Sequence, residues 1–137
     1  MGSKPLSIGQ TACRTVTVTG DAIKAFCGAC GDENPIHLDP SYAATTAFGR
    51  PIAPGLLTAS YMAAIFANDL PGPGSIYMDQ SLRFLAPVYE GDDVFATVTV
   101  VAIDETRGVV TFRTECSVAG RPVLIGEARI RSTLWHS

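Results

Sequence analysis

The sequence predicts an α+β domain in which a curved antiparallel sheet wraps around one buried central helix. The second half of the chain supplies most of the strands, because apolar and polar residues alternate through Val94–Val101, Val110–Val118 and Leu124–Arg131. The segment Leu56–Ala67 is instead apolar nearly all round, which is typical of a helix that is buried on every side. With 137 residues the chain has the length of one domain, so we expect residues 1–137 to fold as a single unit.

The first predicted elements are a strand and a helix. Thr15–Thr19 alternates valine with threonine and is expected to form a short strand. Gly20-Asp21 then offers an N-cap for a helix that runs to about Cys30. Gly31 is expected to end this helix, and residues 31–40 are expected to form a loop.

The middle of the chain is predicted to hold a short helix, an irregular segment and the apolar helix. Pro40–Ala44 is compatible with a single helical turn, whereas Pro51 and Pro54 make Phe48–Pro54 irregular. The apolar helix follows from Gly55, and its alanine and serine positions allow other backbone to approach closely. We expect the sheet to curl around this helix.

The remaining strands are separated by turns. Ile76–Val88 is expected to form one long strand that ends at Pro87 and the turn Glu90-Gly91-Asp92. Hairpin turns are expected at 104–108 and at Ala119-Gly120, between the three alternating segments.

Composition and charge exclude several functions. The net charge of −3 does not provide the basic field that sequence-independent nucleic-acid binding requires. The longest apolar stretch is too short to span a bilayer, and residues 1–5 lack the apolar core of a signal peptide, so we expect a cytoplasmic protein without membrane association. Only 17% of the residues are charged, which is compatible with an apolar surface covered by a second copy, a homodimer.

The four cysteines are interpreted as free thiols, because nothing in the sequence indicates secretion. Cys27 and Cys30 have the CxxC spacing of zinc and thiol-exchange sites. A zinc site would need two further ligands, and His37 is the only nearby candidate. A redox pair would be expected at the start of a helix, whereas here a predicted helix leads into the motif. Thiol exchange therefore stays a remote alternative, and no metal is expected.

The polar side chains that could do chemistry gather in one segment. Asp32 and His37 lie five residues apart, and Pro35 between them interrupts a continuous helix, so the segment can fold back and bring carboxylate and imidazole together. Such a pair can activate water by general acid–base chemistry. The alternative is an aspartate that stops the helix beside a surface histidine. His136 is the penultimate residue, where fraying argues against catalysis.

A second candidate feature is the start of the apolar helix. If the helix begins at Gly55, its N–H is one of the unpaired first-turn donors, and the helix dipole favours negative charge there. A thioester carbonyl that gains enolate character would be stabilised at this point. The alternative is that Pro54-Gly55 is simply a helix start.

These segments resemble a known family. Residues 26–40 (FCGACGDENPIHLDP) and 48–57 (FGRPIAPGLL) look like the MaoC-type (R)-specific enoyl-CoA hydratases, which have the hot-dog fold. The resemblance continues through Gly74–Tyr77, Phe84–Val88 and Gly126–Ala128. It therefore covers nearly the whole chain, and its Gly-Asp-x-Asn-Pro-x-His segment is specific. The family acts as dimers whose sheets join, so a homodimer is again expected.

The resemblance implies reversible syn hydration of a trans-2-enoyl-CoA to the (R)-3-hydroxyacyl-CoA, without a metal or redox cofactor. Asp32 and His37 would activate the water and deliver the proton, Asn34 would fix the loop, and the Gly55 N–H would polarise the thioester. Ala63 and Phe66 look like acyl-pocket positions, and the bulky Phe66 favours a short substrate such as crotonyl-CoA; core packing is the alternative. The pathway stays open between polyester-precursor supply, β-oxidation and another acyl-CoA route.

One departure from the family pattern leaves two other functions open. The family commonly has histidine where this chain has Pro54, which removes a donor and a ring. The chain could therefore be a dehydratase for a branched or dicarboxylic acyl-CoA, or an acyl-CoA-binding protein without catalytic activity. Hot-dog thioesterases and acyl-carrier-protein dehydratases of the FabZ type would instead need a carboxylate within the buried helix, and Leu56–Ala67 contains none, which counts against both.

Overall fold

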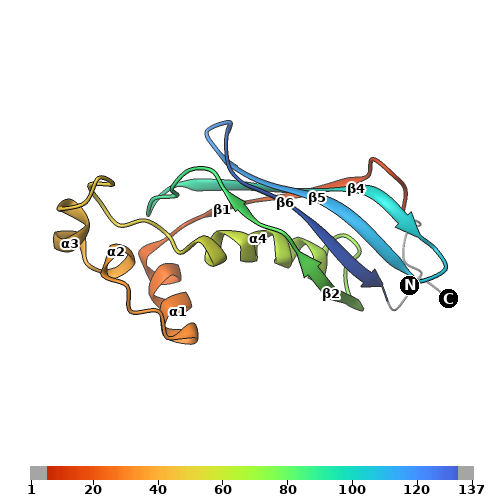
Figure 1. The fold of residues 1–137 in the computed structure, drawn as a ribbon, viewed down its shortest axis with the longest axis horizontal. Helices are drawn as coiled ribbons and strands as arrows, with labels where there is room; N and C mark the ends of the chain where they lie inside the picture. Colours follow the sequence, from red (N-terminus) through yellow and green to blue (C-terminus); the bar gives the residue numbers. More distant parts are fainter. Residues whose placement is uncertain (1–5, 133–137) are drawn as a thin grey trace.

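The computed structural model describes residues 6–132, and its centre is a curved antiparallel sheet (Figure 1). Strands β4 (Asp93–Asp104), β5 (Val109–Val118) and β6 (Arg121–Ser132) follow one another as hairpins, as the alternating pattern predicted. The tight turn between β5 and β6 has positive φ at both Ala119 (51°) and Gly120 (79°), the geometry that matches the twist of a two-residue hairpin.

The sheet is completed by strands that precede β4 in the chain. The order is β1-β4-β5-β6-β2, with β1 (Thr11–Thr17) on one edge and β2 (Ser75–Gln80) at the other end. The two-residue strand β3 (Arg83–Phe84) also pairs with β6. All these pairings are antiparallel, which confirms the predicted α+β class.

Helix α4 (Gly55–Asn68) lies along one face of this sheet (Figure 1). The core forms between them from side chains that are almost fully buried. Those of α4 are Met62, Ile65 and Phe66, and those of the sheet include Val94, Ala96, Val98, Val100, Phe112, Leu124 and Ile130.

The prediction that this helix is buried on every side is wrong for the single chain. Leu56 is 60% exposed, and Ser60 and Ala67 are exposed as well. The sheet curls over one side of α4, and no other element within residues 6–132 covers the opposite side at these positions.

The three short helices gather at one end of the molecule, beyond the start of α4 (Figure 1). They are α1 (Gly20–Cys30), α2 (Pro35–Leu38) and α3 (Pro40–Ala44). The N-cap of α1 is Thr19, whose hydroxyl accepts the Ala22 N–H at 3.1 Å, and not the predicted Gly20-Asp21. Residues 31–40 are also not all loop, because α2 forms within them.

Two predicted strands have different bounds in the structure. The first begins at Thr11 and ends at Thr17, because Thr19 is used as the cap of α1. The long strand predicted over Ile76–Val88 is divided into β2 and β3. Ser81 lies at the division, where its N–H donates to Glu127 O at 2.8 Å and its carbonyl packs closely against Gly126.

Some sequence-based expectations fall outside the described part of the chain. These are the expectation that residues 1–5 lack the apolar core of a signal peptide and the expectation that His136 is not a catalytic residue. Within residues 6–132, no helix is both long enough and apolar enough to cross a membrane.

Candidate active site

The end of α1 positions Asp32. Gly31 adopts the left-handed conformation (φ 81°) that commonly ends a helix, and its N–H donates to Cys27 O at 2.9 Å. The N–H of Asp32 donates to the same carbonyl at 3.1 Å. The backbone of Asp32 is therefore anchored to the last turn of α1, and its side chain starts from a defined point.

Asn34 connects this carboxylate to the helix that carries His37. The Asn34 N–H donates to Asp32 Oδ1 at 2.9 Å, which leaves Oδ2 to point elsewhere. The Asn34 side chain caps α2 by accepting the Ile36 N–H at 3.1 Å, and Pro35 occupies the first helical position that its fixed φ suits. Pro35 thus starts a new short helix after the chain has turned. The segment between α1 and α2 is fixed at one end by the bond from Asp32 to Cys27 O and at the other by the Asn34 cap.

His37 is oriented by a backbone carbonyl fifteen residues away. Its Nδ1 lies 2.7 Å from Ile52 O, and because a carbonyl only accepts hydrogen bonds, Nδ1 carries the proton. In the neutral ring Nε2 is then left as a base. The Ile52 N–H in turn donates to Ile36 O at 3.2 Å, so α2 and the segment around Ile52 are joined in both directions.

The structure brings the predicted pair together. Nε2 of His37 is 3.7 Å from Oδ2 of Asp32, and the two side chains are 11% and 30% exposed. This separation is too long for a direct hydrogen bond, which spans about 2.7–3.2 Å. One water molecule can therefore bond to the carboxylate and the imidazole at the same time.

His37 and the start of α4 share one cavity of about 520 Å³. Gly55 lies at the first turn of α4, and the preceding Pro54 supplies no side-chain cap. Within the described residues nothing accepts the Gly55 N–H, so it stays a free donor beside the cavity. The other lining residues are Phe48, Ile52, Ala53, Leu56, Thr58, Phe84, Leu85, Ala86, Pro87, Val88, Val123 and Leu124.

Phe84 has a role that the sequence analysis missed, because it placed this residue only in a predicted long strand and in a segment that resembles the family. Strand β3 pairs Phe84 with Leu124 and turns its ring onto the start of α4. A methyl group placed on Gly55 would lie 2.6 Å from Phe84 Cε1, so the ring occupies the space that a side chain at Gly55 would need. The ring is 52% exposed and lines the cavity.

Ala63 and Phe66 do not line this cavity. The Phe66 ring is 2% exposed and packs against Phe112 and Tyr77, with centroids 4.8 and 5.5 Å apart. Phe66 therefore packs in the core of the single chain, and the acyl-pocket roles of Ala63 and Phe66 stay predictions.

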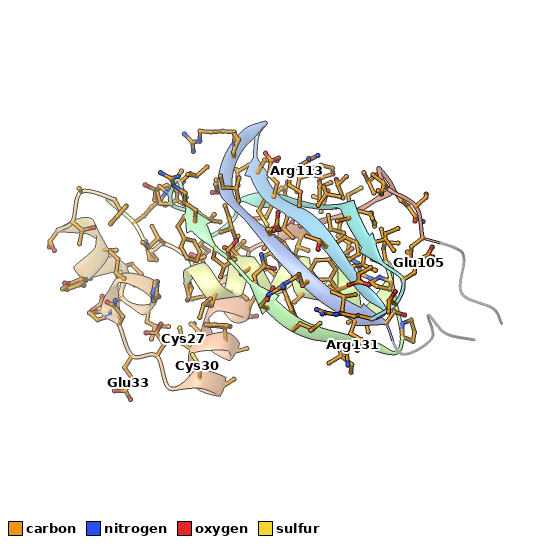
Figure 2. The ribbon with its side chains drawn as sticks, turned by 45° about the vertical axis from the view of Figure 1, so that its right-hand side comes forward. Cys27, Cys30, Glu33, Glu105, Arg113 and Arg131 are labelled. Carbon is orange, nitrogen blue, oxygen red and sulfur yellow. The ribbon has the colours of Figure 1, made fainter. Side chains whose placement is uncertain are left out.

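The cysteines next to the site are free thiols. Cys27 is buried and Cys30 is exposed, and Figure 2 shows both at the α1 end of the molecule with Glu33. Burial, followed by the nearby Asp32 and Cys30, raises the pKa of the Cys27 thiol. A raised pKa favours an unreactive thiol. Within residues 6–132 no group of three or more histidine, cysteine, aspartate or glutamate side chains could hold a metal ion.

The model of the MaoC-like domain matches residues 6–120. The chain belongs to the MaoC-like family. The (R)-specific enoyl-CoA hydratase of Rhodospirillum rubrum is 47% identical over 122 residues, which are 89% of this chain and 85% of that protein. The 3-hydroxybutyryl-CoA dehydratase of Methylorubrum extorquens is 39% identical over 126 residues, covering 92% and 80% of the two chains.

A solved MaoC-like relative has the same fold. The structure of the (R)-hydratase from A. caviae involved in PHA biosynthesis has a TM-score of 0.90 and 41% identity, and the match covers 93% of this chain and 97% of that one. The predicted hot-dog architecture is therefore confirmed, with the correction that one face of its helix is open in the single chain.

Proposed function

We propose that the protein is an (R)-specific enoyl-CoA hydratase that reversibly adds water to a short trans-2-enoyl-CoA such as crotonyl-CoA. The observation that carries this proposal is the pair Asp32 and His37, with Oδ2 and Nε2 3.7 Å apart, beside an apolar cavity and a free helix N–H. The names of the relatives from R. rubrum and M. extorquens support the same chemistry.

In the proposed mechanism, Asp32 and His37 hold one water molecule. His37 Nε2 takes a proton from this water as its oxygen forms a bond to C3 of the substrate. The electron pair of the C2–C3 double bond moves toward the thioester oxygen, and the imidazolium then returns a proton to C2. Because the water and the proton donor occupy the same side of the substrate, hydrogen and hydroxyl add to the same face, which is syn addition.

The thioester oxygen is stabilised at the start of α4. The free Gly55 N–H and the positive end of the helix dipole both favour the negative charge that develops on this oxygen. Hydration of an alkene conjugated to a thioester needs only acid–base groups and such donors, so the proposed reaction uses no metal or redox cofactor.

The cavity disfavours a dicarboxylic acyl chain. His37 and Thr58 are the only residues with polar side-chain atoms in its described lining, and no arginine or lysine is among them. A dicarboxylic acyl-CoA would bury a second carboxylate there without a partner, which is unfavourable. Turnover of a panel of linear, branched and dicarboxylic enoyl-CoAs tests this choice directly.

The decisive experiment follows the loss of enoyl absorbance when purified protein meets crotonyl-CoA. We expect turnover to the (R)-alcohol, and we expect Asp32→Asn and His37→Ala to lower kcat by about 10²–10⁴-fold. Asp104→Asn is the matched control, because Asp104 is the last residue of β4, does not line the cavity and should leave the rate unchanged when replaced. Binding of the thioester without turnover by folded protein would instead favour an acyl-CoA-binding protein in which Pro54 has removed the activity.

The proposal includes a homodimer. Strand β2 lies at the end of the sheet order and exposes Ile76, Tyr77 and Met78 by 54%, 43% and 47%, while the open face of α4 exposes Leu56. A second copy would cover these apolar surfaces. Light scattering on the purified protein should give twice the chain mass, and Met78→Glu should shift it toward the monomer.

The assignment to one domain and to the cytoplasm is also part of this proposal. The family match over residues 6–120 supports a single unit. The four free cysteines of the described chain favour a reducing compartment. Cell fractionation with antibody detection would test the location.

A further inference from the structure

Thr58 has a hydroxyl that its own helix does not use. The residue is only 2% exposed, yet its hydroxyl has no hydrogen-bond partner among residues 6–132. Two other hydroxyls show the usual arrangement, in which the side chain donates to the carbonyl three residues earlier in the chain. Ser60 Oγ donates to Leu57 O at 2.5 Å, and Thr46 Oγ1 donates to Ala43 O at 2.7 Å. The Thr58 hydroxyl is therefore not used by its own helix. Within the described residues Tyr61 Oη, and not Thr58 Oγ1, is the fully buried side-chain oxygen without a partner, so the Thr58 hydroxyl remains accessible from the cavity that Thr58 lines.

The backbone around Thr58 explains why the hydroxyl is not bonded back. The carbonyl one turn earlier, Pro54 O, already accepts the Leu57 N–H at 3.1 Å and the Thr58 N–H at 3.4 Å. A ligand that displaces water from the cavity would leave this hydroxyl without a partner, which is unfavourable unless the ligand supplies an acceptor. An oxygen atom of the ligand would be such an acceptor.

Thr58 lines the cavity that contains His37 and Gly55. It follows Gly55 by three residues on α4, which places the two on the same face of the helix. Side chains on a helix lean toward its N-terminus, so Thr58 leans over the turn that begins at Gly55. Because Gly55 has no side chain, nothing of its own lies between the Thr58 hydroxyl and the Gly55 N–H.

We propose that Thr58 Oγ1–H donates a hydrogen bond to the thioester carbonyl oxygen of the substrate, next to the bond from the Gly55 N–H. This inference rests on the proposed hydratase function and adds a second donor to it. When water adds at C3, the electron pair of the double bond moves to the thioester oxygen, and both donors stabilise the charge there. Protonation of C2 then returns that pair. Asp32 and His37 act on the water, so Thr58 contributes a separate interaction.

The kinetic test compares Thr58→Val, which removes the hydroxyl and keeps the shape, with Thr58→Ser, which keeps the hydroxyl. We expect Thr58→Val to lower kcat by about 100-fold and to change KM by less than about 3-fold, because the bond strengthens as charge develops. Thr58→Ser should retain most of the rate. Ser60→Ala is the control, since the Ser60 hydroxyl is engaged with Leu57 O and Ser60 is not among the cavity-lining residues.

A spectroscopic readout separates this role from a structural one. Butyryl-CoA has the same thioester but no double bond to hydrate, so the infrared carbonyl stretch of the bound molecule reports its hydrogen bonds. The stretch should fall to lower frequency on binding to the wild type and to Thr58→Ser, and the fall should be smaller with Thr58→Val. Wild-type kcat or a wild-type carbonyl frequency in Thr58→Val would overturn the proposal.

The outcomes distinguish the two proposals. If the wild type binds butyryl-CoA but does not hydrate crotonyl-CoA, the hydratase function fails, and the carbonyl frequency still decides whether Thr58 contacts the thioester. If the wild type does not bind butyryl-CoA, the role of Thr58 is overturned as well. Should Thr58→Val fail to fold, Thr58→Ala removes the same hydroxyl and is measured in its place.

Discussion

Replacing Gly55 with alanine should have an effect on stability that depends on Phe84. The ideal Cβ at Gly55 would lie 2.6 Å from Cε1 and 2.9 Å from Cζ of the Phe84 ring. Carbon atoms in contact are normally about 3.5–4.0 Å apart, so the ring must retreat by about 1 Å. Gly55 is not among the residues with positive φ, and alanine is therefore compatible with its backbone conformation. The Phe84 ring is what excludes a side chain here.

The size of the effect follows from the packing. Overpacking costs about 1–3 kcal/mol, whereas glycine to alanine in a helix contributes about 0.5–1 kcal/mol of stability. Gly55→Ala should therefore destabilise the native protein by about 1 kcal/mol. Phe84 is 52% exposed, so Phe84→Ala should cost about 2 kcal/mol, half of the value for a buried phenylalanine. In that background Gly55→Ala should stabilise by about 0.5–1 kcal/mol.

Urea unfolding of the wild type, both single variants and the double variant measures this coupling. Gly28→Ala is the matched control, because Gly28 is also helical and a Cβ there would meet nothing within 4 Å. It should stabilise the protein equally with and without the Phe84 ring. If Gly55→Ala and Phe84→Ala are additive within about 0.5 kcal/mol, the steric argument is refuted.

Two further predictions concern the segment from Asp32 to His37 and the core. Asn34→Ala removes the cap of the helix that carries His37 and should lower kcat by about 10-fold. Asn34→Asp should largely avoid this loss, because aspartate caps a helix equally well. Equal kcat values for the wild type and both variants would contradict the role of the cap. Burial raises the pKa of the Cys116 thiol from 9.0 to about 12, so as the pH rises this thiol ionises in the unfolded chain before it ionises in the folded protein. The free energy of unfolding should therefore fall between pH 9 and 12, by at most about 1.4 kcal/mol per pH unit. Urea unfolding over this range should show a shallower fall for Cys116→Ala, and an unchanged pH dependence would contradict the cause given.

The sequence determined the elements whose patterns are local. Alternating side chains over 94–101, 110–118 and 124–131 placed three strands correctly, because each residue of a strand faces either the core or the solvent. The apolar run after Gly55 placed α4, and Gly31 marked the end of α1. The segment from Asp32 to His37 also identified the polar cluster, since its residue types are close together in the chain.

The tertiary structure decided what depends on contacts between distant residues. The bond from His37 to Ile52 O fixes the imidazole and its proton, and Phe84 reaches Gly55 from a strand that pairs only with β6. The division of the strand predicted over 76–88 follows from the close approach of Ser81 to Gly126. These features depend on which segments meet in space, and hydrophobic periodicity within one segment carries no information about that. The open face of α4 has the same origin, because a pattern shows that a helix is apolar but not which surface covers it.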